Sequence, residues 1–163
     1  MLIDINTAAV VVVLVVGMLG YMANYRRRIN QLFAVLSIWA IAWIAARKLA
    51  TESADAVFWV RITNSFGGIF PLIFSHIKEA VSNEKKEGVA SGFSWASWLL
   101  AGFLFAVPFT SWFIPSESTP SAPKWGVGYY AYSLLTGAWF FRLFSKTLIE
   151  ARKSQGVVRL ELQ

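Results

Sequence analysis

Long runs without a charged residue alternate with short charged clusters, and this pattern constrains the fold more than any other feature. Residues 5–25 are uncharged and are followed by Arg26, Arg27 and Arg28, and residues 88–116 are uncharged over 29 positions. Only 15% of the residues are charged, against about 25% in soluble domains. Because a helix needs roughly 20 apolar residues to cross a bilayer and can bond all its own backbone groups there, the pattern predicts an all-α integral membrane protein.

Five segments have the length and composition of a membrane span. We expect a single transmembrane helical domain over residues 1–163, a bundle of five helices that ends in a cytoplasmic helical tail. In the fourth segment we expect residues 112–116 to lie at the membrane surface. The predicted spans are 5–25, 29–46, 56–77, 89–113 and 125–145, and the predicted tail is 146–163.

The distribution of charge predicts an orientation. With the N-terminus outside, the inner segments hold eleven basic and five acidic residues, and the outer segments hold four of each. The whole net charge of +6 then lies on the cytoplasmic side, as the positive-inside rule expects. The basic balance is therefore a topology signal, and no nucleic-acid partner is needed to explain it. We expect a multi-pass protein of the bacterial inner (cytoplasmic) membrane.

Several kinds of chemistry are excluded by composition. The chain has no cysteine, which excludes disulfides, thiolate catalysis and cysteine-ligated metals, and its one histidine excludes a multi-histidine site. No phosphate-binding glycine loop, Ser/His/Asp set or carboxylate cluster within a span is present. We therefore expect no enzyme activity, no catalytic or metal-binding residues and no cofactor.

Apart from Arg142 near the inner end of the fifth predicted span, Arg61 is the only charged residue within a predicted span, and it lies about six residues from the outer end of the third. A charge at the centre of a span costs roughly 2.5 to 3.5 kcal/mol on insertion scales, so such residues often have a function. One interpretation is an anionic ligand held by Arg61, with Trp59 and Trp125 lining the site. The other is that Arg61 only anchors the helix by extending towards the interface, where tryptophans also gather.

Several local patterns occur together along nearly the whole chain. The first predicted helix ends in an arginine cluster, an apolar helix beginning at Asn30 follows, and the third helix begins with an aromatic-x-Arg pattern and has a proline near its middle. The fifth is rich in Gly and Tyr and leads into a basic helix. The segments are 26–28, 30–46, 58–61, 70–71, 126–132 and 156–163.

In these patterns the chain resembles the N-terminal seven-helix membrane region of bacterial histidine kinases and related signalling proteins. The resemblance covers the first five helices and none of the last two helices or output domains of that family, so it implies either a five-helix relative or a truncated form. The resemblance implies a sensory role, and it does not extend to kinase activity.

Two functional hypotheses follow. The first is a non-catalytic sensory or signal-input module, in which a ligand, a lipid or the state of the membrane shifts helix packing and the fifth helix passes the shift to a cytoplasmic partner. The second is a small accessory or assembly subunit of a larger membrane complex. A transporter or channel subunit is a weaker third alternative, because no acidic residue lies within a predicted span. In each case the partners are the lipid bilayer and other membrane or cytoplasmic proteins.

The orientation can be tested with a reporter fused after Gln163. A fluorescent protein that matures only in the cytoplasm is expected to be bright, whereas alkaline phosphatase at the same position is expected to be inactive, because the basic segments remain inside. The opposite result would refute the predicted topology.

Overall fold

The computed structural model describes residues 5–83, 95–119 and 124–161. Within these ranges every regular element is a helix, which confirms the all-α expectation. The elements are α1 (Ile5–Ala23), α2 (Arg28–Glu52), α3 (Ala56–Asn83), α4 (Trp95–Ala106), the short 3₁₀ helix η1 (Val107–Phe109) and α5 (Val127–Glu161).

Three of these helices are long and apolar enough to cross a membrane. They are α1, α2 and the Ala56–Val81 part of α3, while α4 continues into η1 as a shorter apolar helix, Trp95–Phe109. Length and composition therefore support three of the five predicted spans within the described part of the chain.

The helix α2 is longer than the predicted span 29–46, because the charged residues that follow residue 46 do not end it. The helix continues through Arg47 and Lys48 to Glu52. The Arg47 guanidinium lies 5.9 Å from the ring centroid of Trp43, and Lys48 pairs with Glu52 one turn later at 3.9 Å. These contacts let the helix extend past its apolar part, since charge affects where a span meets water more than where a helix ends.

The fourth predicted span, 89–113, is only partly helical. Residues 89–94 lie outside the described residues, and the helical part ends with η1 at Phe109. Pro108 has no amide N–H to continue the ladder, and the Thr110 N–H turns back to the Val107 carbonyl at 3.0 Å. In contrast, α5 runs without a break from the fifth predicted span into the predicted tail and ends at Glu161.

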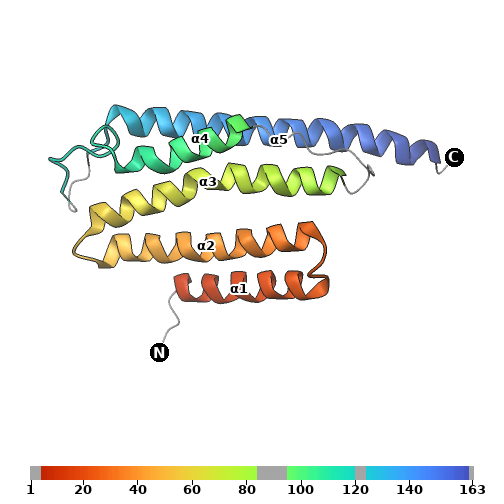
Figure 1. The fold of residues 1–163 in the computed structure, drawn as a ribbon, viewed down its shortest axis with the longest axis horizontal. Coiled ribbons are helices and arrows are strands. Elements are labelled where there is room, and N and C mark those ends of the chain that lie inside the picture. Colours follow the sequence, from red (N-terminus) through yellow and green to blue (C-terminus); the bar gives the residue numbers. More distant parts are fainter. Residues whose placement is uncertain (1–4, 84–94, 120–123, 162–163) are drawn as a thin grey trace.

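The helix α3 packs against α2, α4 and α5, whereas α1 packs on α2. Figure 1 shows α1, α2 and α3 side by side in chain order, with α4 and α5 on the opposite side of α3. The C-terminal end of α5 extends past the end of α3 in the same view (Figure 1).

Close packing of α1 on α2 depends on one glycine. A Cβ atom on Gly17 would lie 2.5 Å from the Cβ and the Oγ of Ser37, which is nearer than atoms can approach. Ser37 is buried, and its hydroxyl donates to the Phe33 carbonyl of its own helix at 2.9 Å. A small residue on each helix thus lets the two backbones approach closely, as in many membrane helix pairs.

Two tryptophans join α2 to α3. The Trp39 indole N–H donates to the Phe66 carbonyl at 2.9 Å, and its ring meets the Phe66 ring edge-on at 4.8 Å. One turn later Trp43 meets Phe70 edge-on at 5.9 Å. Both tryptophans therefore pack between helices, and the bond to Phe66 satisfies the polar end of Trp39.

The most buried side chains lie between α3, α4 and α5. Leu104 and Tyr132 form a cluster with Phe113 and Ile114, which come from the turn after η1. Phe113 and Ile114 are only 0% and 1% exposed, and the membrane-surface position expected for residues 112–116 stays a prediction. The apolar side chains of Phe113 and Ile114 are buried against protein instead of lipid.

The contact at Gly17 can be tested against an open glycine. Gly17→Ala is expected to lower the free energy of unfolding by about 1–3 kcal/mol, because the added methyl overlaps Ser37. Gly102, with nothing within 4 Å of an added Cβ, is the control. Gly102→Ala should raise it by roughly 0.5–1 kcal/mol through helix propensity. Both are measured by denaturant unfolding in detergent micelles, and equal effects would contradict the packing.

Candidate functional site

The turn formed by residues 110–114 is the centre of the candidate site. It leaves η1 at Thr110 and carries Phe113 and Ile114 into the core. A turn in this position places backbone N–H and C=O groups in an apolar environment, where each unpaired group costs free energy. The surrounding helices must therefore supply its hydrogen-bond partners.

Arg61 of α3 supplies two of these partners. Its Nη1 donates to the Phe109 carbonyl at 3.0 Å and its Nη2 to the Ile114 carbonyl at 2.9 Å. The guanidinium thereby bridges the last residue of η1 and the last residue of the turn. A cation is favourable here, because the carbonyls at a helix C-terminus carry partial negative charge.

Ser65 lies one helical turn after Arg61 and faces the same neighbour. Its hydroxyl oxygen lies 2.8 Å from the Phe105 carbonyl near the end of α4 and 3.0 Å from the Arg61 carbonyl of its own helix. Ser65 is fully buried, and its single proton serves one of the two carbonyls at a time. The i,i+4 pair of Arg61 and Ser65 therefore holds the C-terminal end of α4 on α3.

Two glycines at the start of α5 hold the other side of the turn. The Gly126 N–H donates to the Phe113 carbonyl and the Gly128 N–H to the Trp112 carbonyl, each at 2.9 Å. A Cβ atom on either glycine would collide with the Trp112 backbone. Only glycine allows the two chain segments to approach this closely.

Aromatic rings fill the space around the turn. The Phe113 ring meets Tyr129 edge-on at 5.4 Å and Tyr132 at 5.3 Å. The Tyr132 hydroxyl donates to the Asn64 carbonyl of α3, and its ring lies over Gly68, where an added Cβ would come within 3.2 Å of it. The first turns of α5 are thus attached to both the turn and α3.

The structure brings together two of the three predicted ligand-binding residues. Arg61 binds the turn from α3, and Trp125 packs against it through Phe113 at 6.3 Å and stacks on Tyr129 at 4.3 Å. Trp125 remains 37% exposed, so one part of its ring is accessible. Trp59 is half-buried in α3, and its ring contact is with Phe58 at 5.5 Å.

The bonding of Arg61 defines what the site can bind. The two hydrogen bonds to the turn use two of the five N–H donors of a guanidinium. Three donors remain, and that of Nε is buried without a hydrogen-bond partner. The site can therefore offer donors to an anion or a carbonyl group. No cluster of three or more metal-ligating side chains occurs among the described residues.

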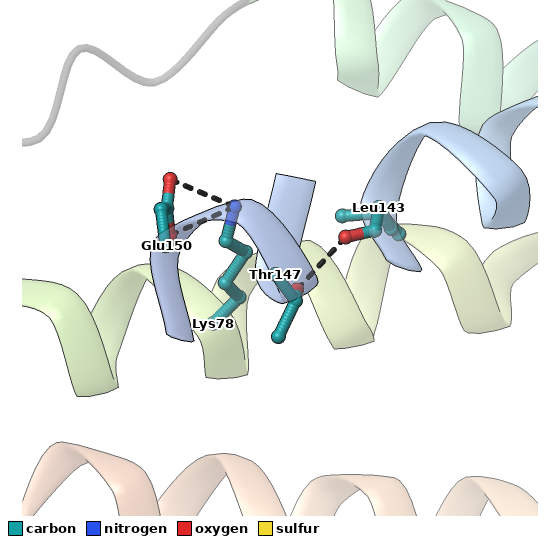
Figure 2. Close-up of polar contacts among 4 residues, drawn as sticks. All are labelled: Lys78, Leu143, Thr147 and Glu150. Atoms are coloured by element: carbon teal, nitrogen blue, oxygen red, sulfur yellow. Dashed lines mark hydrogen bonds and ion pairs between the residues drawn. The ribbon is translucent and has the colours of Figure 1, made fainter. Parts of the chain in front are cut away.

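An ion pair joins α3 and α5 at the opposite end of the bundle. The Lys78 ammonium lies 3.2 Å from each carboxylate oxygen of Glu150 (Figure 2). In the same view the Thr147 hydroxyl donates to the Leu143 carbonyl of its own helix at 2.8 Å. Because Glu150 is half exposed, the pair contributes at most about 1 kcal/mol.

Some residues of the site were not singled out by the sequence analysis. Ser65, Tyr132 and the buried Phe113 were missed, although two signals for them were present. The four-residue spacing from Arg61 to Ser65 places both on one face of a helix, and the paired Gly126 and Gly128 indicate a close backbone approach. Their partners in residues 105–114 lie more than 40 positions from Arg61, too far for a local pattern.

Comparisons with protein families, with curated proteins and with solved structures found no match. The resemblance to histidine kinase membrane regions therefore stays a prediction, and the function has to be argued from the geometry of the bundle.

The bridge made by Arg61 can be tested with Arg61→Lys, because an ammonium lacks the planar fork that reaches two carbonyls. Loss of one charged hydrogen bond is expected to cost roughly 1.5–3 kcal/mol of local stability. Hydrogen exchange at the amides of Gly126 and Gly128 should then become about tenfold faster or more.

Lys124→Ala is the matched control for this variant. Lys124 pairs with Glu117 at 3.4 Å in an exposed position near the same turn. The control should cost less than about 1 kcal/mol and leave exchange at the glycines nearly unchanged. Equal exchange in both variants would show that Arg61 does not hold the turn.

Proposed function

We propose that this protein is a non-catalytic signal-input module of the bacterial inner membrane. In this proposal the N-terminus lies outside, the turn of residues 110–114 lies near the outer surface, and α5 carries a packing change to a cytoplasmic partner. The orientation follows from the placement of the eleven basic residues, and the membrane location from the three apolar helices.

The attachment of α5 at two places along its length is the observation that carries the proposal. Near its start α5 is bound to the turn through Gly126 and Gly128, and further along it is paired with α3 through Glu150 and Lys78. At 1.5 Å per residue, its 35 residues span roughly 52 Å, against a hydrocarbon core of about 30 Å. In this proposal one continuous helix would connect the candidate site to the opposite side of the membrane.

The input would act on Arg61. An anionic group that binds its remaining N–H donors, with Trp125 at the edge of the site, would compete with the Phe109 and Ile114 carbonyls for the guanidinium. A ligand that binds one arrangement of the turn more tightly than another shifts the population by that difference. Because Gly126 and Gly128 are bonded to the turn, the start of α5 would move with it.

The output would be a shift of the inner half of α5. Its ion pair with Lys78 is weak and partly exposed, so α5 can change its position relative to α3 at small cost. Helix shifts of about 1–2 Å are typical of such switches. The part of α5 beyond Glu150 would present the change to a cytoplasmic protein.

The proposed coupling can be tested with nitroxide labels, because the chain has no cysteine of its own. Labels at Val81→Cys in α3 and Arg152→Cys in α5 report the distance between these helices on the predicted inner side. Adding Arg61→Ala, which releases the turn, is expected to shift or broaden this distance by about 2 Å. Pulsed electron paramagnetic resonance measures it, with labelled chains diluted by unlabelled ones.

Lys124→Ala in the same labelled background is the control and should leave the distance unchanged. An unchanged distance in the Arg61→Ala protein, with exchange at Gly126 and Gly128 increased, would refute the coupling. Purification separates this proposal from the accessory-subunit hypothesis. A stable stoichiometric complex with other membrane subunits would favour the accessory role.

A further inference from the structure

The helix α5 has two opposite faces, of which only one is used within the bundle. Tyr129, Tyr132 and Trp139 pack on the core cluster, and Glu150 reaches Lys78 from the same side. At 100° per residue Tyr132, Trp139 and Glu150 lie within about 20° of one another around the helix, and Tyr129 lies about 60° from Tyr132. The opposite face contacts no other part of the described chain closely enough to be buried.

This opposite face forms an apolar stripe, which we call the α5 seam. Its large side chains are Tyr130, Leu134, Phe141, Phe144 and Leu148, and the first four are between 64% and 73% exposed. Leu148 is 44% exposed, and of the apolar residues beside the seam Leu135 and Phe140 are more covered than any seam member, at 37% and 38%, whereas Ile149 is 54% exposed. Gly137 completes the seam, with nothing within 4 Å of an added Cβ.

The spacing of the seam is that of a coiled coil. Successive members at positions 130, 134, 137, 141, 144 and 148 are separated by alternating steps of four and three residues. This 3.5-residue period keeps a stripe facing a partner helix that winds around the first with a left-handed supercoil. Contact with lipid imposes no such period, since any apolar side chain satisfies it.

Charge is absent from every position of this register. The helix carries seven charged residues, and none of them occupies a position of the seam. The same spacing continues in the sequence through Ala151, Gln155 and Val158, which are also uncharged. The charged residues are Arg142, Lys146, Glu150, Arg152, Lys153, Arg159 and Glu161. In a parallel pair of identical helices a charge on the seam would face its own copy and repel it.

Lipid cannot cover the whole seam. A helix of roughly 52 Å exceeds the hydrocarbon core by roughly 20 Å, and the predicted span ends at residue 145. Leu148 and the positions that continue the period then lie where water is the alternative to a protein partner. Apolar side chains such as that of Leu148 favour burial against another helix where the alternative is water.

We infer that α5 pairs with α5 of a second copy of this chain, in parallel and in register, through the α5 seam. Two copies inserted with the same orientation place this helix parallel, so each seam position meets its equivalent. Gly137 lets the two backbones approach closely within the membrane, and Phe144 and Leu148 pack as knobs into holes further along. The inference does not depend on the signalling role, because the spacing, exposure and charge pattern belong to α5 alone.

Cysteine cross-linking of the full chain in native membranes tests this pairing. Since the chain is cysteine-free, any disulfide reports the introduced residue. Phe144→Cys and Leu148→Cys are expected to form about fivefold more disulfide-linked dimer under mild oxidation than Ile149→Cys and Lys146→Cys. These controls are exposed residues on the same helix that lie off the seam.

A second pair of variants tests the energetics. Leu148→Glu places like charges opposite each other in the dimer. It is expected to weaken dimerisation about tenfold, or 1.4 kcal/mol. Energy transfer between labelled chains in vesicles measures the dimerisation. Ile149→Glu, which lies off the seam, should change the dimerisation affinity little. Three results would each overturn the inference: uniform cross-linking at all four positions, no cross-linking at the seam, or equal effects of the two glutamates. If a different protein covers α5, the seam cysteines will not cross-link to each other.

Discussion

The bridge from the Arg61 guanidinium to the Phe109 and Ile114 carbonyls is the interaction on which the rest of this structure depends. Where water is excluded, backbone groups that leave a helix must find partners in the protein. A planar guanidinium can bond two separated carbonyls through two different nitrogens, whereas a lysine presents its donors from a single nitrogen and a hydroxyl has only one proton. With these carbonyls bonded, Phe113 and Ile114 can lie in the core, and α5 can begin directly beside the turn.

The two faces of α5 follow from this start. Gly126, Gly128 and Tyr132 set the rotation of the helix, since their bonds to the turn and to Asn64 determine which side meets the bundle. The opposite side is then the apolar seam, and Glu150 falls opposite Lys78. A helix fixed in rotation at one end, weakly paired further along and apolar on its free side is suited both to transmit a shift and to pair with a copy of itself.

Much of the architecture could be predicted from the sequence, and the errors have a common cause. The charge-free runs located the helices and distinguished Arg61, because hydrocarbon penalises charge wherever it lies along the chain. Helix ends were less accurate. α2 passes Arg47, since its side chain can extend to a neighbouring ring, and α4 ends near Pro108 because proline removes a backbone donor. The burial of Phe113 between helices was not predicted, because apolarity alone does not distinguish a lipid-facing side chain from one in a protein core.

The sequence by itself determined that this chain is a bundle of apolar helices, that Arg61 is its exceptional residue and that α5 carries an apolar heptad free of charge. These are local patterns, written in the order of residues along the chain. Only the tertiary structure decided what Arg61 bonds, that Trp125 shares its turn while Trp59 packs on Phe58, and that the heptad of α5 faces away from the bundle. Those properties depend on which distant segments of the chain contact one another. Close packing determines these contacts jointly for all the helices, so no local pattern predicts them.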